Sequence, residues 1–312
     1  MKRSFFLMGI LLPVLCNAQN ADSARAPRIP LVTTSPRLGG VTLTDLAVPI
    51  KAGGNTFLLQ QTVVDAGIPV YKNFTGPHAV LIKTGVRYEG LSLENEKNIG
   101  SNAFTSLSVP LIASYSFNRK TSLTLIGLGT VSSDWKSPIG SGDIQYTAGV
   151  RLGFQPSKTL RWGVTLTYIS NYSGKFLIPL PDVEWAINSK WSLSALVPAR
   201  VSLKYKLSPV QSLGITGGYT GGMYRLNPSG QNQQSQYLNL QQYSGGLIYD
   251  LKLGERWKLN LIAGHSFEQR LETFNMDQKV SFDNFGKLNS RKANVSYRQN
   301  SFVLQAGISY AF

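Results

Sequence analysis

The sequence has one cysteine, Cys16, and two histidines, His78 and His265, in 312 residues. A single cysteine cannot form a disulfide within the chain, so stability must come from burial and from closure of a sheet. Two histidines separated by most of the chain lack the spacing of a metal site. A glycine-rich phosphate-binding motif is also missing, and we therefore expect neither a metal nor another cofactor.

Long hydrophobic runs are missing after the N-terminus. The apolar residues 5–15 follow a basic start and precede the small-residue sequence Cys16-Asn17-Ala18. This pattern predicts a cleaved secretory signal peptide, residues 1–18, and the run is too short for a transmembrane helix. Cys16 leaves a lipoprotein signal as the alternative, which the bulky Leu15 disfavours. Without a helical span, a membrane protein must be a closed barrel, because only helices and closed barrels satisfy every backbone group in lipid.

Acidic residues are scarce, since 16 Asp and Glu stand against 31 Lys and Arg, a formal net charge of +15. Such a surplus can indicate nucleic-acid binding, but the basic residues are scattered and an exported chain rarely meets nucleic acid. A basic pore lining, or loops that face anionic lipid headgroups, explains the surplus better. We therefore expect no nucleic-acid partner.

What the sequence does have is alternation, most clearly in residues 301–312. Period-two alternation predicts a strand, and a tilted strand needs roughly 9–11 residues to cross a bilayer. A terminal aromatic strand is typical of bacterial outer-membrane barrels, whose assembly machinery reads it as a partner during biogenesis. The alternative is the edge strand of a soluble sandwich. The predicted outward face carries Phe302, Leu304, Ala306, Ile308, Tyr310 and Phe312.

The same pattern divides the chain into a polar, proline-dotted periplasmic lead-in, residues 19–40, and a barrel, residues 41–312. Residues 41–50 and 56–64 are weakly patterned strand candidates. The regular strand candidates are 80–89, 106–117, 123–131, 143–154, 161–168, 176–187, 191–207, 213–225, 237–253, 257–269 and 301–312. The fold class is therefore all-β, a transmembrane antiparallel up-and-down barrel of about 12 strands, with 14 possible.

The uncertainty in the count centres on Pro198. Proline lacks a ladder donor, so it marks either a bulge in one long strand or a turn between two short strands. The apolar phase of residues 191–207 continues without a break, which favours the bulge. At the later turn, residues 253–255, we expect Lys252 to lie opposite Arg256. The long polar loops, residues 227–236 and 271–300, are expected on the extracellular side.

Strand phase also predicts which residues line the lumen and which lie at the membrane interfaces. Charges inside a barrel are either wet or joined in ion pairs, and about 12 strands give a bore between filled small barrels and open porins of roughly 16–18 strands. We predict a narrow, basic-leaning passage, with the loops and the lead-in as candidates for occluding it. The predicted lumen residues are Lys83, Arg87, Glu89, Asp143, Arg151, Arg161, Asp182, Glu184, Lys204, Lys206, Asp250, Lys252, Arg256, Lys258 and Glu268. The predicted interface aromatics, at strand ends, are Trp135, Trp162, Trp185, Trp191, Trp257 and Phe312.

Three segments carry a family resemblance: Gly140-Ser141-Gly142-Asp143-Ile144-Gln145-Tyr146, Leu180-Pro181-Asp182-Val183-Glu184-Trp185-Ala186-Ile187-Asn188 and Pro198-Ala199-Arg200. With these segments the chain resembles an uncharacterised bacterial outer-membrane β-barrel family, the domain of unknown function numbered 6268. The resemblance implies a barrel fold in the cell outer membrane, among outer-membrane lipid and lipopolysaccharide. It offers no assigned active site, so no functional residue is carried over.

Three functions fit these observations. The leading interpretation is a narrow passive channel for small polar or anionic solutes. The alternative is a non-conducting structural or partner-binding barrel. A lipid hydrolase is the third, because some barrels carry a lipid-facing histidine and serine two residues apart. Here Ser266, which follows His265, lies on the opposite face, and His78 has no serine at that spacing, so we expect no enzyme and no catalytic residue.

Overall fold

The computed structural model describes residues 39–52, 55–75, 78–228, 234–280 and 291–312. The predicted signal peptide, nearly all of the lead-in and parts of the two long predicted loops lie outside the described residues. Within these ranges no helix is long and apolar enough to cross a membrane.

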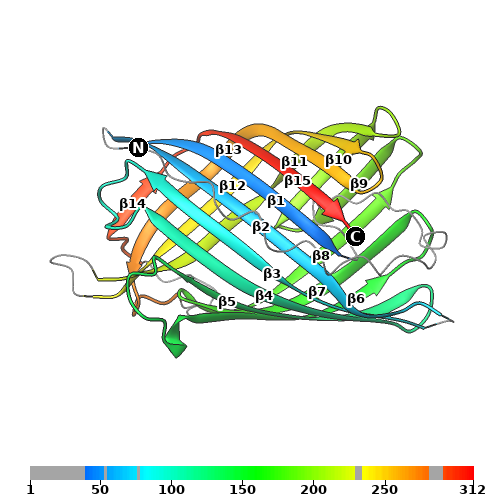
Figure 1. Cartoon of the computed structure of the whole chain (residues 1–312), viewed down its shortest axis with the longest axis horizontal. Helices are drawn as coiled ribbons and strands as arrows, with labels where there is room; N and C mark the ends of the chain where they lie inside the picture. Colours follow the sequence, from blue (N-terminus) through cyan, green and yellow to red (C-terminus); the bar gives the residue numbers. More distant parts are fainter. Residues whose placement is uncertain (1–38, 53–54, 76–77, 229–233, 281–290) are drawn as a thin grey trace.

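The described chain is a barrel of antiparallel strands (Figure 1). The ring closes because β1 pairs with β15, and β13 pairs with both β12 and β15. Fourteen of the fifteen strands form the ring, and the short β14 extends β13 beyond β15. The all-β barrel prediction is confirmed at the larger of the two strand numbers. The strands are β1 Gly40–Ala52, β2 Asn55–Asn73, β3 Ala79–Glu94, β4 Ala103–Ser116, β5 Thr121–Ser133, β6 Ile144–Phe154, β7 Leu160–Asn171, β8 Gly174–Ala186, β9 Trp191–Leu196, β10 Arg200–Lys206, β11 Gln211–Leu226, β12 Gln236–Leu253, β13 Trp257–Asn275, β14 Val295–Arg298 and β15 Phe302–Ala311.

The apolar side chains of most strands face outward. In β4, Leu107 and Val109 are 43% and 54% exposed, whereas Ser106 and Ser108 are buried inside the ring. Side chains alternate between the two sides of a strand, so this strand presents one apolar and one polar face. A soluble sandwich would bury the apolar faces against each other, and that alternative is therefore wrong.

Pro198 lies in a turn, and the predicted bulge is wrong. β9 and β10 form a short hairpin in which Leu196 pairs with Arg200. A turn of three residues pairs two even-numbered positions, or two odd-numbered positions, across the hairpin. The odd-numbered residues therefore face outward both before and after the turn, and the apolar alternation shows no break. The sequence pattern of such a hairpin therefore cannot be distinguished from that of one long strand.

Two other predicted boundaries are also wrong. The turn after β12 has three residues, so Lys252 pairs with Lys258 and not with Arg256. The loop expected to begin at residue 271 begins later, because β13 continues to Asn275 and β14 pairs with it. Residues 271–274 are buried on both faces of the strand, and a strand that is buried on both faces shows no alternation.

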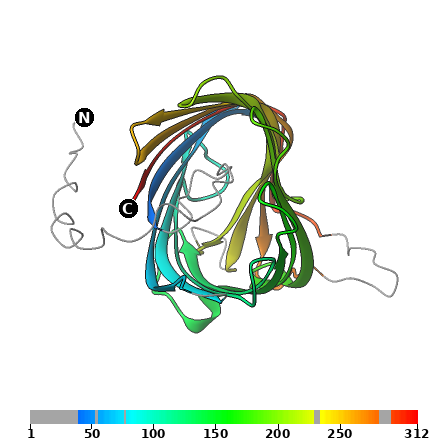
Figure 2. The same ribbon diagram turned by 90° about the vertical axis from the view of Figure 1, so that its right-hand side faces the viewer.

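The barrel has two different rims. The turn rim has the short connections 117–120, 155–159, 187–190, 207–210 and 254–256, and both Gly40 and Ala311 lie there. The loop rim has the longest connections, among them residues 95–102 and 134–140. At the loop rim the sheet leaves the wall and folds inward, and the ends of β12 and β13 lie inside the ring in the view along the barrel (Figure 2).

We call this inward part the flap: residues 219–226 of β11, 236–243 of β12, 268–275 of β13, and β14. The flap begins beside a row of glycines, in which Gly217 pairs with Gly245 and Gly246 pairs with Gly264. A Cβ on Gly264 would lie 2.3 Å from the Gly245 carbonyl oxygen, so the strands approach here more closely than any side chain allows. A β-bulge between Tyr243 and Ser244 adds to the bend.

Candidate functional site

The loop end of the lumen is filled by an apolar cluster that we call the plug. The inward faces of β1–β4 meet the inner face of the flap there, and the Phe104 and Tyr224 rings lie 5.6 Å apart. Val48, Leu93 and Leu238 are fully buried. The sixteen buried members are Leu46, Val48, Ile50, Phe57, Leu59, Leu91, Leu93, Ile99, Phe104, Tyr224, Leu226, Leu238, Leu240, Leu271, Tyr297 and Val303.

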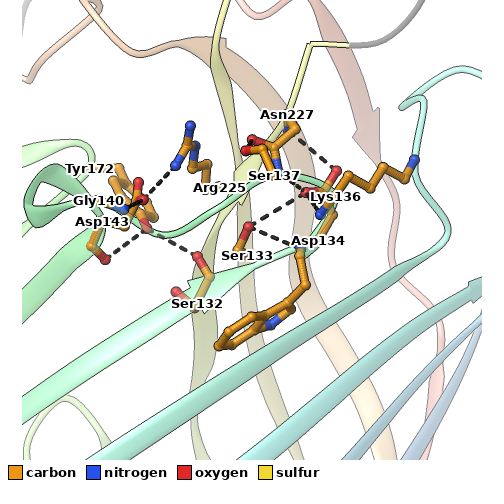
Figure 3. Close-up of polar contacts among 11 residues, drawn as sticks. Ser132, Ser133, Asp134, Lys136, Ser137, Gly140, Asp143, Tyr172, Arg225 and Asn227 are labelled. Atoms are coloured by element: carbon orange, nitrogen blue, oxygen red, sulfur yellow. Dashed lines mark hydrogen bonds and ion pairs between the residues drawn. The ribbon is translucent and has the colours of Figure 1, made fainter.

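A polar clasp joins the flap to the opposite wall (Figure 3). Arg225 of β11 forms a parallel bridge with Ser133 of β5, and the Asp134 backbone N–H donates to the Arg225 carbonyl at 3.0 Å. The Arg225 guanidinium pairs with the buried Asp143, and Asn227 donates to the Asp134 carboxylate. The clasp therefore fixes the flap across the lumen.

The outer face of the flap packs against the turn between β7 and β8. Tyr172 in this turn clusters with Tyr237 and Phe274, and its hydroxyl donates to the carbonyls of Ser132 and Asp143 at 3.0 Å. Burial, together with the nearby carboxylate of Asp143, raises the pKa of Tyr172 to about 12. Tyr172 is therefore neutral at physiological pH and acts as a hydrogen-bond donor in the clasp.

A polar layer lies directly below the plug. Gln61 donates to Glu89 at 2.6 Å, and the buried Tyr224 hydroxyl donates to the same carboxylate. Arg87 completes the layer, with its guanidinium 3.4 Å from Glu89 and 3.8 Å from Asp65. The predicted inward residues of β3 thus meet a residue of the flap that the sequence pattern did not place in the lumen.

The lower lumen holds further ion pairs. Arg151 donates twice to Asp182, at 2.8 and 2.6 Å. Asp250 accepts from Lys204 and from Lys258, and the Lys258 ammonium lies 3.0 Å away. Of the remaining predicted lumen residues, Arg161 lies 3.8 Å from Glu184, while Lys83, Lys206 and Lys252 share the phase of these inward positions.

Two predicted lumen residues are wrongly assigned. Arg256 lies in the turn after β12 and donates to the Tyr310 hydroxyl at 3.0 Å. Glu268 follows the bulge in the β12–β13 ladder, so its side chain is exposed while its neighbour Gln269 is buried inside. Asp143 is brought to the loop rim by the short turn Ser141–Asp143 and reaches the flap instead of the open lumen.

The tryptophans divide unequally between the rims. Trp162, Trp185, Trp191 and Trp257 lie at the turn rim, where Trp257 packs 4.8 Å from Tyr310, and Phe312 ends the chain there. Trp135 lies at the loop rim, half exposed, and its indole N–H donates to the Thr105 carbonyl at 3.0 Å.

Arg200, at the start of β10, is a lumen residue that the sequence pattern did not single out. Its side chain is exposed, and it shares the parity of the inward residue Lys204, which places it on the lumen side of β10. Among the described residues no carboxylate pairs with it. Its equal parity with Lys204 could have identified it, because the apolar phase of residues 191–207 is unbroken whether Pro198 marks a turn or a bulge.

The wall is interrupted above the short β9–β10 hairpin. β8 pairs with β9 only over residues 182–186, and β10 pairs with β11 only over residues 212–218. Beyond the hairpin, residues 174–181 of β8 and 219–226 of β11 share no ladder in the described chain. We call this pair of edges the seam.

The histidines form no site of hydrolase type among the described residues. The His265 Nδ1 atom lies 2.7 Å from the backbone oxygen of Ser266, whose own hydroxyl is buried and donates to Ser301. His78 stacks on Tyr115 at 5.8 Å. No group of three metal-ligating side chains occurs in the described ranges.

Comparison with solved structures finds other β-barrels at low sequence identity. The NanC porin is 9% identical, with a TM-score of 0.36, and the match covers 86% of this chain and 100% of that one. The monoaromatic hydrocarbon channel TodX is 10% identical, with a TM-score of 0.36 and coverage of 87% and 89%. A Pseudomonas aeruginosa FadL homologue is 11% identical, with a TM-score of 0.41 and coverage of 87% and 89%. All three scores are below 0.5, so these likenesses carry no argument about what passes through this barrel.

A search of curated proteins returns no match. The family model of the domain of unknown function DUF6268 matches residues 59–311, which include every strand from β3 to β15. This match agrees with the resemblance carried by the three sequence segments. The chain belongs to the DUF6268 family.

Proposed function

We propose that the protein is an outer-membrane barrel that conducts small anionic solutes and that the flap closes it at the extracellular end. The apolar outer face and the closed ring support placement in a membrane, because closure of the ring pairs the strand edges everywhere in the described wall except at the seam. On this placement the loop rim is extracellular, and outer-membrane lipid and lipopolysaccharide surround the wall. We also propose that the barrel assembly machinery recognises the exposed apolar face of β15, which carries Phe302, Leu304 and Ile308.

The observation that carries the solute preference is the positive charge around Arg200. Each lumen carboxylate below the plug already faces a cation: Asp182 faces Arg151, and Asp250 faces two lysines. Arg200 shares the inward face of β10 with Lys204, and no carboxylate among the described residues pairs with Arg200, so like charges meet here without compensation. An anion that enters the lumen relieves this repulsion, whereas a cation increases it.

Ion selectivity in planar bilayers tests this proposal. Under a salt gradient, we expect the reversal potential to favour chloride over potassium. Arg200→Gln should reduce that preference, Arg200→Lys should retain it, and the turn-rim variant Lys158→Gln should leave it unchanged. The absence of conductance steps from folded protein, or equal permeability to both ions, would overturn the proposal.

A second candidate is a non-conducting barrel, which the plug specifically favours. The sixteen buried side chains of the plug fill the loop end of the lumen, and an axial path has to displace them. If this candidate is correct, variants that loosen the flap will remain silent in the same bilayers. We also propose that the barrel is not an enzyme, and unchanged lipid composition after incubation with phospholipid and lipid A would support this.

A further inference from the structure

We propose that the seam is a lateral portal through which single-chain amphipathic anions pass between the lumen and the surrounding lipid. The proposal rests on the placement of the barrel in a membrane, and it does not depend on conduction along the barrel axis. Three features support it: the position of the seam, the chemistry of its edges, and the charge at its foot.

The seam lies at the level of the membrane. The backbone of Val197, in the hairpin turn, bonds to Pro181, which is four residues along β8 from the interface residue Trp185. At about 3.3 Å per residue and a tilt of about 40°, the hairpin tip lies about 10 Å above that tryptophan. The apolar band of such barrels is about 25 Å tall, so the seam opens just below the middle of this band and continues upward.

The β8 edge of the seam is short of exposed donors. The Val197 N–H donates to the Pro181 carbonyl at 2.9 Å, so residue 181 turns its backbone toward this edge. Pro179 has the same parity and turns the same way. Neither proline has an N–H, so the part of this edge next to the hairpin, residues 179–181, presents no backbone donor to lipid.

Several backbone groups of the β11 edge are satisfied from within the protein. The Tyr219 N–H donates to Ala199 at 2.9 Å, and the Arg225 carbonyl accepts from Asp134. The Met223 carbonyl accepts from Ser132 and from Gln145. Next to the hairpin, at Pro179, Pro181 and Tyr219, neither edge therefore presents a bare backbone N–H to an alkyl chain, which could not compensate one.

Apolar side chains border the seam on both sides of the wall. Leu177 is 63% exposed on the outer face, and Val197 at the hairpin tip is 45% exposed. Leu196 belongs to the inward face of β9 and is nevertheless 37% exposed. An alkyl chain that moves through the seam therefore contacts apolar groups from the lipid to the lumen.

Arg200 lies at the foot of the seam on the lumen side, paired in register with Leu196 and Gly218. It borders a cavity of about 100 Å³, which Gly217, Thr220 and Gln305 also line. This volume suits a carboxylate, sulfate or sulfonate head group, and a guanidinium binds such oxyanions through paired hydrogen bonds. An anionic head at Arg200 places its tail in the seam.

The loop end of the seam is closed, which directs passage sideways. The Val280 N–H donates to Ser173 at 2.6 Å, and the Lys279 ammonium donates to Tyr172 at 2.8 Å. The chain that follows β13 thus ties the flap to the β7–β8 turn. The loop end of the β8 edge is therefore held to the flap above the portal.

Photolabelling of the purified full chain in bilayers tests the proposal. The probe is dodecyl sulfate with a diazirine in its chain, and labelled residues are identified by mass spectrometry. We expect labelling at Leu177, Leu180 and Val197 to exceed labelling at Val150 and Leu166, which are exposed on the uninterrupted wall. Arg200→Gln should lower seam labelling about tenfold, equivalent to about 1.4 kcal/mol, and Arg200→Lys should retain most of it.

Uniform labelling of the lipid-facing wall, or seam labelling unchanged in Arg200→Gln, would overturn the portal. A matched uptake assay uses a double variant, Leu180→Cys with Thr220→Cys, joined by bis-maleimides of increasing length. Linking should stop transfer of the probe out of the lumen, whereas linking Val150→Cys to Leu166→Cys should not. Chloride conductance is recorded separately, so failure of the axial channel and failure of the portal are distinguishable.

Discussion

Removing one buried side chain from the plug should open the barrel more often. Leu271 lies on the flap strand β13 and is fully buried. A Leu→Ala change at such a site costs about 2–5 kcal/mol, and the closed position of the flap bears this cost because the plug forms only there. The ratio of open to closed barrels should then rise roughly 30- to 4,000-fold.

Single-channel recording measures this change directly. Leu271→Ala should raise the fraction of time in conducting states, with little change in the size of each step, because the lower lumen is untouched. Leu261→Ala is the matched control: it makes the same change on the same strand at an outward, exposed position. If Leu271→Ala is folded yet no more conductive than Leu261→Ala, the plug is not the barrier and the reasoning fails.

Three further predictions concern the flap and its clasp. Arg225→Gln and Asp143→Asn should each loosen the flap. A double-mutant cycle of these two changes, measured by hydrogen exchange of β11, should give a coupling free energy of about 1–3 kcal/mol. Additive effects of the two changes would contradict the ion pair. Because folding raises the pKa of Tyr172 to about 12, its contribution is complete below its ordinary pKa near 10 and is lost as the pH rises through 12. Protection of the flap should therefore fall between pH 10 and 12, and Tyr172→Phe should lose that component of the pH dependence. Gly264→Ala should prevent the flap from folding inward, because the new Cβ would lie 2.3 Å from the Gly245 carbonyl oxygen. Gly127→Ala is the control, because its Cβ would lie 4.0 Å from the nearest atom. In gel-mobility assays of barrel folding, Gly127→Ala should behave as the parent and Gly264→Ala should not.

Local alternation predicted those parts of the barrel in which each strand has one lipid face and one lumen face. Residues 143–154 and 161–168 became β6 and β7 with their expected faces, because each side chain there has a single environment. The charged residues of these strands could be placed for the same reason, and Arg151 and Asp182 meet across the lumen side of the sheet. The identities of ion-pair partners could not be read from the sequence, because they depend on register between strands.

The flap could not be predicted because its strands have left the wall. Residues 236–240 are buried on both faces, so they lack the alternation that marks a barrel strand. The bridge between Arg225 and Ser133 joins strands that are far apart in the ring, and no pattern within either strand records such a contact. A strand end that loses its alternation while remaining apolar is therefore a signal for inward folding, not for a loop.

The glycine pairs support the same argument from the backbone. Glycine weakens a strand that has only to span a membrane, because it contributes no side chain to packing. Pairs such as Gly217-Gly218 and Gly245-Gly246 are instead placed where β11 and β12 leave the ring, and a Cβ on Gly246 would lie 2.3 Å from the Ala263 carbonyl oxygen. The bend that brings the flap into the lumen thus explains two observations. The strands approach each other closely at the glycines, and the sequence beyond the glycines no longer alternates between apolar and polar residues. The same bend removes β11 from the edge of β8, so the structure that closes the barrel along its axis also interrupts its wall.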